Sequence, residues 1–126
     1  MAEEPIAFLR AGLRPAARTA FWGGAPSVSF ERRELDHILR IYGLMVSAGE
    51  WRDYAIDFLD DRAVFSIFRR TAEVPLYRVE KRPESRVRQG QYAIIGATGE
   101  MLKRGHDLKQ VLRYFDRKLI KALKTA

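Results

Sequence analysis

Two segments of the chain repeat apolar residues at the spacing of three and four that is typical of one face of an α-helix. The first covers residues 30–47, follows Ser29 as its N-cap, and ends before Gly49, a residue type that closes helices in a left-handed conformation. The second covers residues 108–124 and follows Asp107, whose side chain is well suited to cap it. The pattern therefore predicts one helix towards each end of the chain.

Between the two helices, apolar and polar residues alternate with the period of two that marks β-strands. The run 63–69 is apolar on both faces, which favours a central strand. In the third run Pro75 lacks the amide that a central strand would use, which favours an edge or the start of a strand. Residues 82–90 are polar and predict an exposed loop, and 97–100 predict a hairpin turn. The predicted strands are residues 51–59, 63–69, 73–81, 91–95 and 101–103.

The predicted order is a helix, four to five strands and a second helix, joined by short connections. Short connections favour pairing between consecutive strands, so we expect an antiparallel meander with one face under the helices. The fold class is therefore α+β, with a meander sheet of four to five strands flanked by an N-terminal and a C-terminal helix. Residues 1–28 contain three of the five prolines and predict an extended arm, which precedes a single domain at 29–126.

Composition excludes several classes of chemistry. The chain has 126 residues, enough for one domain with its own core. It has no cysteine, which excludes disulfides, thiolate metal sites and cysteine nucleophiles. Glu3 and Glu4 stand where a secretory signal carries positive charge, and no stretch of about 18 apolar residues is present for a membrane span. We therefore predict a cytoplasmic protein.

Charge is divided unevenly along the chain. There are 23 basic and 16 acidic residues, for a net charge of +7. Residues 1–61 contain 7 basic and 10 acidic residues, whereas residues 62–126 contain 16 and 6. A half this basic attracts nucleic acid, anionic lipid or an acidic protein surface without choosing among them.

Ten basic residues of the second half are the candidate nucleic-acid-binding residues. Five of them recur at helical spacing on the flank of the C-terminal helix that lies away from its apolar stripe, and the others belong to the predicted loop and hairpin. If the three segments converge, they form one phosphate-binding surface. An ordinary solvated helix face is an equally good account of the helical set. The ten residues are Arg82, Arg86, Arg88, Lys103, Arg104, Lys109, Arg113, Arg117, Lys121 and Lys124.

Aromatic residues on the strands bear on the same hypothesis, because single-stranded nucleic acid stacks on exposed rings. Phe65, Phe68, Tyr77 and Tyr92 all lie on predicted strands. Any of them that points away from the helices would add a stacking platform, although strand aromatics usually belong to the core.

An enzymatic role is the least supported alternative. Asp53 and Asp57 share strand parity and so face the same side, where they either bind a divalent ion or pair with neighbouring arginines. The two histidines, His37 and His106, are too few for an ordinary metal site, and no pair of nucleophile and base is visible. We therefore predict no enzymatic activity, no metal and no cofactor.

Three segments carry a resemblance to a known family: YGLMVSAGEWRDYAIDFLDDRAVFSIFRR, PLYRVEK and LKRGHDLKQVLRYFDRKL. They resemble an uncharacterised domain-of-unknown-function family of small alphaproteobacterial proteins, over about residues 30–120. The resemblance implies a bacterial cytosolic protein. It implies no activity, cofactor or catalytic residue.

The function that the sequence favours is a non-enzymatic nucleic-acid-binding module, for RNA or single-stranded DNA, that uses the C-terminal helix and the loop around Arg86. The alternative is a protein–protein adaptor or small regulatory subunit, including a homodimer, that binds an acidic partner or a second copy through an open sheet face or strand edge.

Overall fold

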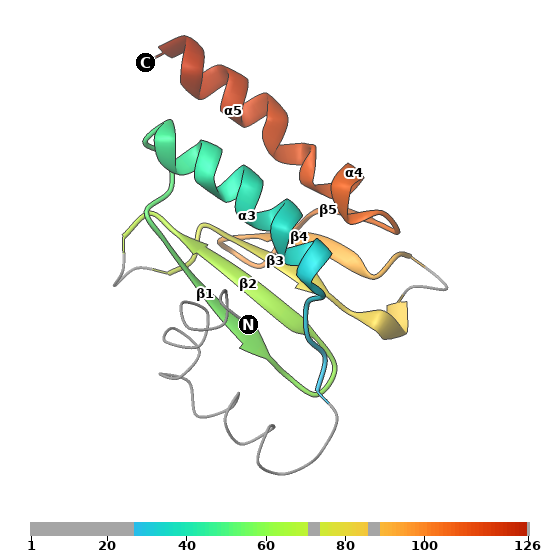
Figure 1. The fold of residues 1–126 in the computed structure, drawn as a ribbon. Helices are drawn as coiled ribbons and strands as arrows, with labels where there is room; N and C mark the ends of the chain where they lie inside the picture. The colour runs from blue at the N-terminus through green and yellow to red at the C-terminus, as the bar shows by residue number, and fades with distance from the viewer. Residues whose placement is uncertain (1–26, 71–73, 86–88, 126) are drawn as a thin grey trace.

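The computed structural model describes residues 27–70, 74–85 and 89–125 (Figure 1). The predicted arm at 1–28 lies almost wholly outside them. The elements, in chain order, are α3 (Arg32–Ser47), β1 (Asp53–Phe58), β2 (Ala63–Phe68), β3 (Tyr77–Lys81), a 3-10 turn (Pro83–Ser85), β4 (Tyr92–Gly96), β5 (Met101–Gly105), α4 (Leu108–Leu112) and α5 (Tyr114–Thr125).

The five strands form one antiparallel sheet in the order β1-β2-β3-β4-β5. Each strand therefore pairs with its neighbour in the sequence, and the predicted α+β meander is confirmed. The helices α3, α4 and α5 all cover the same face of this sheet (Figure 1). The opposite face of the sheet carries no helix of the described chain.

The core lies between the helices and the sheet. Phe65 of β2, Ile94 of β4 and Phe115 of α5 are each fully buried, and Ile38 of α3 packs into the same cluster. Trp51 joins them from the connection between α3 and β1, and its ring and that of Phe115 form a T-shaped pair at a centroid distance of 4.9 Å. Burial of these large apolar side chains is the main term that holds the helices on the sheet.

The first helix begins later than predicted. Its N-cap is Glu31 rather than Ser29, because Glu31 and Glu34 form a reciprocal capping box that satisfies two free amides of the first turn. Its end agrees with the prediction, since Gly49 follows the C-cap with a φ of 80°.

The predicted C-terminal helix is two helices, because the helix is interrupted at Arg113, between α4 and α5. Arg113 donates its amide to the carbonyl of Gln110, a tightened turn that ends α4. The predicted cap is confirmed, since the Asp107 side chain accepts a hydrogen bond from the amide of Lys109 at 3.0 Å. The break turns α5 relative to α4 and leaves both of them on the core (Figure 1).

The position of β3 decides between the two alternatives that Pro75 left open. β3 lies in the middle of the sheet, between β2 and β4, so of the two positions that Pro75 suggested the edge is wrong and the start of a strand is right. Pro75 instead precedes the strand, and pairing begins after it with the bond from the amide of Leu76 to the carbonyl of Ile67 at 2.7 Å. The missing amide therefore costs no bond in the ladder. β2 is central, as predicted.

A buried polar cluster ties α3 to the sheet. The carboxylate of Glu34 accepts hydrogen bonds from the Lys81 ammonium, at 2.8 Å, and from the Tyr92 hydroxyl. Burial acts to raise the pKa of Glu34, but the bonds from Lys81, Tyr92 and the Glu31 amide outweigh it and lower that pKa below its usual value. Burial and the Glu34 carboxylate both raise the pKa of Tyr92.

Across the described ranges, no helix combines the length and the hydropathy that a membrane-spanning segment needs.

Candidate anion-binding face of the sheet

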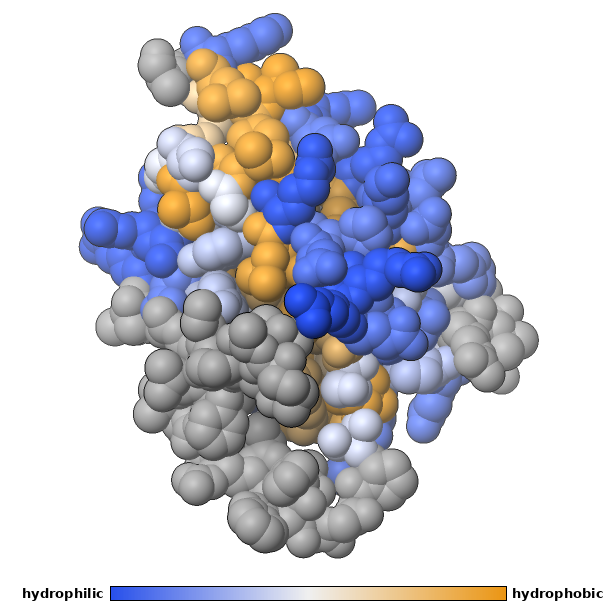
Figure 2. All heavy atoms as spheres, in the orientation of Figure 1, coloured by the Kyte–Doolittle hydropathy of each residue, from blue (hydrophilic) through white to orange (hydrophobic). Residues whose placement is uncertain are grey.

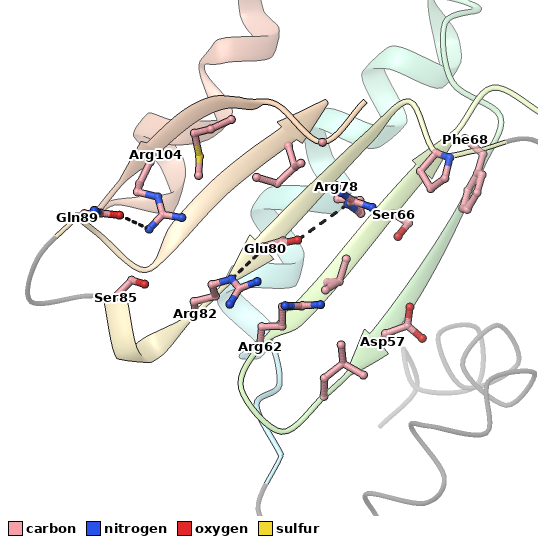
Figure 3. A pocket seen from close by; sticks show the side chains of 16 residues that line it. Asp57, Arg62, Ser66, Phe68, Arg78, Glu80, Arg82, Ser85, Gln89 and Arg104 are labelled. Atoms are coloured by element: carbon pink, nitrogen blue, oxygen red, sulfur yellow. Dashed lines mark hydrogen bonds and ion pairs between the residues drawn. The ribbon is translucent and has the colours of Figure 1, made fainter. Parts of the chain in front are cut away.

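The face of the sheet that lies away from the helices contains a pocket of about 840 Å³ (Figure 3). Successive side chains of a strand point to opposite faces, so Arg78, Glu80 and Arg82 emerge on the same side. Arg104 of β5 shares this side, because it stands opposite Ala93, which in turn stands opposite Glu80. All five strands contribute residues to the floor and rim of the pocket, and this side is called the arginine face below.

Glu80 occupies the floor of the arginine face between two arginines. Arg82 donates from its Nε to Oε1 of Glu80 at 3.2 Å, and the Nε of Arg78 lies 3.9 Å from Oε2. The Glu80 side chain is 10% exposed, whereas the side chains of Arg82 and Arg78 are 34% and 39% exposed. The carboxylate is therefore held below the surface, and the guanidinium groups reach up to solvent.

Three arginines of the pocket keep an unsatisfied donor. The Nε atoms of Arg62, Arg78 and Arg104 are buried and have no hydrogen-bond acceptor among the described residues. Leaving a buried donor without an acceptor costs about 1–3 kcal/mol, and more when the group is charged. An anion that accepts hydrogen bonds from the exposed part of the same guanidinium groups offsets this cost.

The rim supplies the other contacts of these arginines. Arg104 donates from Nη1 to the side-chain oxygen of Gln89 at 2.8 Å. Asp61, which is half exposed, lies 3.4 Å from Arg82 and 3.9 Å from Arg62. Exposed pairs of this kind contribute little to stability and exchange readily for another anion.

The charge of the arginine face is positive in sum. The described residues that line the pocket include four arginines and two acidic residues, Asp57 and Glu80. Ser66 and Ser85 add hydroxyl groups, and Phe68 adds an aromatic ring at one end. The lining is thus suited to anionic ligands that also have a flat, apolar part.

The structure separates the residues that the sequence grouped. Arg82 and Arg104 meet in the pocket, whereas Lys103 is exposed and, opposite Ile94, belongs to the helix side of β5. Arg86 and Arg88 lie outside the described residues. The helical set is exposed on α4, α5 and the break between them, on the other side of the sheet from the pocket (Figure 1): Lys109, Arg113, Arg117, Lys121 and Lys124.

Sequence reasoning missed two members of the arginine face, Arg62 and Arg78. For Arg78 the signal was present, since Arg78, Glu80 and Arg82 occupy every second position of a strand whose other face carries Tyr77 and Val79. Arg62 lies in the turn before β2, and because a turn has no regular alternation, the sequence does not predict the direction of its side chain.

The aromatic residues divide as strand parity requires. Phe68 lines the pocket and is partly exposed. Phe65 and Tyr92 are buried on the helix side, and Tyr77 packs its ring against Phe115 at 5.1 Å. Of the four strand aromatics, one is therefore placed to stack on a ligand of the arginine face.

Asp53 and Asp57 differ in their surroundings. Asp53 is 5% exposed and accepts a bond from the amide of Tyr54 at 2.8 Å, whereas Asp57 lines the pocket. Within the described part of the chain, no three histidine or acidic side chains gather as a metal site requires.

The fold and this face define a class of protein: an α+β meander with helices on one face of the sheet and an arginine-lined pocket on the other. The profile of the family "Protein of unknown function (DUF2794)" matches residues 28–112, and the chain belongs to this family. The predicted membership of a family of unknown function is thereby confirmed, while the bacterial source and the cytoplasmic location stay predictions. No curated protein and no solved structure matches the chain.

Proposed function

We propose that this protein is a non-enzymatic nucleic-acid-binding module that binds RNA or single-stranded DNA across the arginine face. The observation that carries the proposal is the gathering of four arginines in one pocket, three of which have a buried Nε that makes no hydrogen bond. Phosphate oxygens are the acceptors that guanidinium groups match best, since two parallel bonds form from one planar fork.

The layout of the face favours a single strand over a duplex. The arginines come from the strand ends and from different strands, so their guanidinium groups spread across the sheet rather than along one ridge (Figure 3). A single strand can follow such a path and place a base on Phe68, because stacking on an aromatic ring tolerates any base. The polar lining consists mainly of guanidinium groups and the carboxylates among them, which is an arrangement for holding anions.

Two double variants of equal charge change test the proposal. Arg78→Gln with Arg104→Gln removes two arginines from the arginine face, and Arg113→Gln with Arg117→Gln removes two from the exposed helical set. In fluorescence anisotropy with a labelled oligo-uridine RNA and the matching DNA, we expect the first variant to lose at least about tenfold in affinity. We expect the second to change little, since it lowers only the long-range field.

The salt dependence of the same binding gives an independent measure. If the four arginines of the face supply the phosphate contacts, log K falls with log salt at a slope of about 3 for a single strand. A binding constant that does not respond to salt contradicts the proposal. Equal losses of affinity in the two double variants contradict the assignment to the arginine face. They would indicate that basic residues throughout the second half of the chain contribute to binding.

A protein–protein adaptor is the second candidate, and one observation favours it. Ile120 and Leu123 of α5 are 54% and 59% exposed, and Figure 2 shows hydrophobic residues on the surface near the end of this helix. Exposed apolar groups of this kind mark contact surfaces when they are continuous. Sedimentation equilibrium that shows a monomer at every concentration removes the homodimer form of this candidate.

A further inference from the structure

We infer that Glu80 is a positioning residue of the arginine face, which fixes Arg78 and Arg82 for two neighbouring phosphate groups of one strand. The inference rests on the proposed function and deepens it. It distinguishes a built site, in which a buried carboxylate sets the direction of the arginines, from a basic patch in which any acidic residue only weakens binding.

The register of the sheet isolates Glu80 from other polar partners. On the neighbouring strands it stands opposite Val64 and Ala93, and neither has a polar side chain. Its carboxylate therefore turns along β3 to the two arginines that flank it, as Figure 3 shows. Same-face positions of a strand are about 7 Å apart, so one guanidinium group lies on each side of the carboxylate.

Burial makes this arrangement firm. The Glu80 side chain is 10% exposed, and a charged group at that depth is costly unless its oxygens accept hydrogen bonds. The bond from Arg82 at 3.2 Å meets this need and uses the Nε of that arginine. Its Nη1 lies 3.4 Å from the half-exposed Asp61, a contact that a phosphate group can replace, and its Nη2 faces the ligand site. An arginine already held in place loses less rotamer freedom when a phosphate binds.

The two flanking guanidinium groups indicate the class of ligand. One phosphate on each side of the carboxylate requires an anion with at least two successive phosphate groups, as in an oligonucleotide. A single phosphate group would occupy one side of Glu80 and leave the other arginine without its acceptor. The carboxylate between the two sites keeps them apart by repulsion of any phosphate that lies directly over it.

The test uses a substitution for which simple electrostatics and positioning predict opposite results. Glu80→Gln removes one negative charge from the pocket floor, so attraction alone predicts tighter binding of an oligo-uridine RNA. Positioning predicts an affinity about five- to tenfold weaker. The matched control is Glu84→Gln, which makes the same charge change at an exposed residue of the 3-10 turn and should leave the affinity unchanged or slightly raised.

A second variant separates charge from position. Glu80→Asp keeps the charge but shortens the side chain, so it no longer reaches both arginines. Positioning predicts weaker binding for both Glu80→Asp and Glu80→Gln, whereas a purely electrostatic role predicts wild-type binding for Glu80→Asp. Thermal unfolding of each variant establishes that the protein compared is folded.

The salt slope provides a readout that reduced stability does not move. If Glu80 positions two arginines, either variant should lower the slope of log K against log salt by about 0.7 for each phosphate that is no longer neutralised. A smaller folded fraction changes the amplitude of binding and leaves the slope as it is.

The outcomes separate this inference from the proposed function. Wild-type protein that binds the RNA, together with Glu80→Gln that binds as tightly or more tightly, overturns the positioning role alone. Wild-type protein that binds no oligo-uridine and no matching DNA overturns the proposed function and this inference with it.

Discussion

Glu34 shows how one residue links the beginning of α3 to the middle of the sheet. It lies in the first turn of the helix, where its side chain completes the capping box with Glu31, and it also accepts bonds from Lys81 on β3 and Tyr92 on β4. Removing one partner of such a cluster leaves a buried charge without compensation, which costs more than the net gain from forming it.

We therefore expect Glu34→Gln to lower the free energy of unfolding by about 2–3 kcal/mol, because the Lys81 ammonium, with its side chain 12% exposed, loses its counter-ion. Urea unfolding at neutral pH measures this loss. The control is Glu84→Gln, an exposed carboxylate whose removal should change stability by less than about 0.5 kcal/mol.

The same residue gives the protein a pH dependence with a definite sign. The pKa of Glu34 is lowered in the folded state from its ordinary 4.5, so the unfolded chain binds more protons in this range. Its contribution to stability is therefore fully present above pH 4.5 and is lost as the pH falls through the lower, folded pKa. Unfolding curves measured down through this range should converge for wild-type protein and Glu34→Gln. Curves that stay parallel would contradict the role of the Glu34 charge.

For single residues, the sequence predicts only the face of the sheet to which a side chain points, because this follows from the alternation along a strand. Parity places Arg78, Glu80 and Arg82 on one face once β3 is recognised. The partners of Glu34 are 47 and 58 positions away in the sequence, and no local pattern connects residues at that separation.

At the scale of elements, Gly90, which lies just before β4, makes a close backbone approach to Gly105 at the end of β5. Gly90 has a φ of 99°, and a Cβ atom placed there would lie 2.3 Å from the backbone of Gly105. Its neighbour Gln89 is the residue that accepts from Arg104. The close approach therefore holds one rim of the arginine face in place.

Gly90→Ala is expected to destabilise the protein by about 3 kcal/mol or more, because the positive φ and the backbone clash act together. Gly99→Ala is the matched substitution, since Gly99 has a φ of 90° in the hairpin turn but no atom within 4 Å of the added carbon. Its cost should be the conformational part alone, about 1–2 kcal/mol. Equal melting temperatures for the two variants would show that the clash is relieved without cost.

The predicted elements were placed well where a local signal exists, and less well where tertiary packing decides. Hydrophobic spacing located both helical regions and all five strands, and Asp107 and Gly49 were recognised from their residue types. The break at Arg113 was missed, because the apolar spacing continues through it. Pro75 left two alternatives open, an edge strand or the start of a strand, because a missing amide is tolerated at either, and only the pairing of β3 decides between them.

For the whole molecule, the unit that folds is larger than the part that matches the family. The match ends at residue 112, yet Phe115 of α5 is fully buried against Trp51 and Tyr77. The last helix therefore contributes to the core that supports the sheet, while the pocket is lined from the other side. The arginine face should depend on α5 for stability and not for ligand binding.

We expect Phe115→Ala to lower the free energy of unfolding by about 3–5 kcal/mol through the cavity it leaves. Leu123→Ala, on the same helix but 59% exposed, should cost less than about 1 kcal/mol. Chemical denaturation with circular dichroism measures both. A small effect of Phe115→Ala would mean that α5 is dispensable and that the matched region folds alone.

The architecture was predicted from the sequence as a whole, and the candidate site only in part. Short connections leave few alternatives to a meander, so the order of the strands in the sheet could be predicted from their order in the sequence. The basic residues of the second half were recognised as a group, but a sheet has two sides. The structure places Arg82 and Arg104 on one side and the helical set on the other, a division that depends on packing.

The order of the strands also bears on how the chain reaches this structure. Every strand pairs with its neighbour in the sequence, so each pairing closes a short loop at a small cost in chain entropy. Local pairings of this kind form early, whereas the packing of α3 against α4 and α5 joins distant parts of the chain. The hairpins from β1 to β5 therefore need not wait for the two ends of the chain to meet. We therefore expect the surface that carries the arginines to form in the fast, local steps of folding, and the hydrophobic side to close in a slower step.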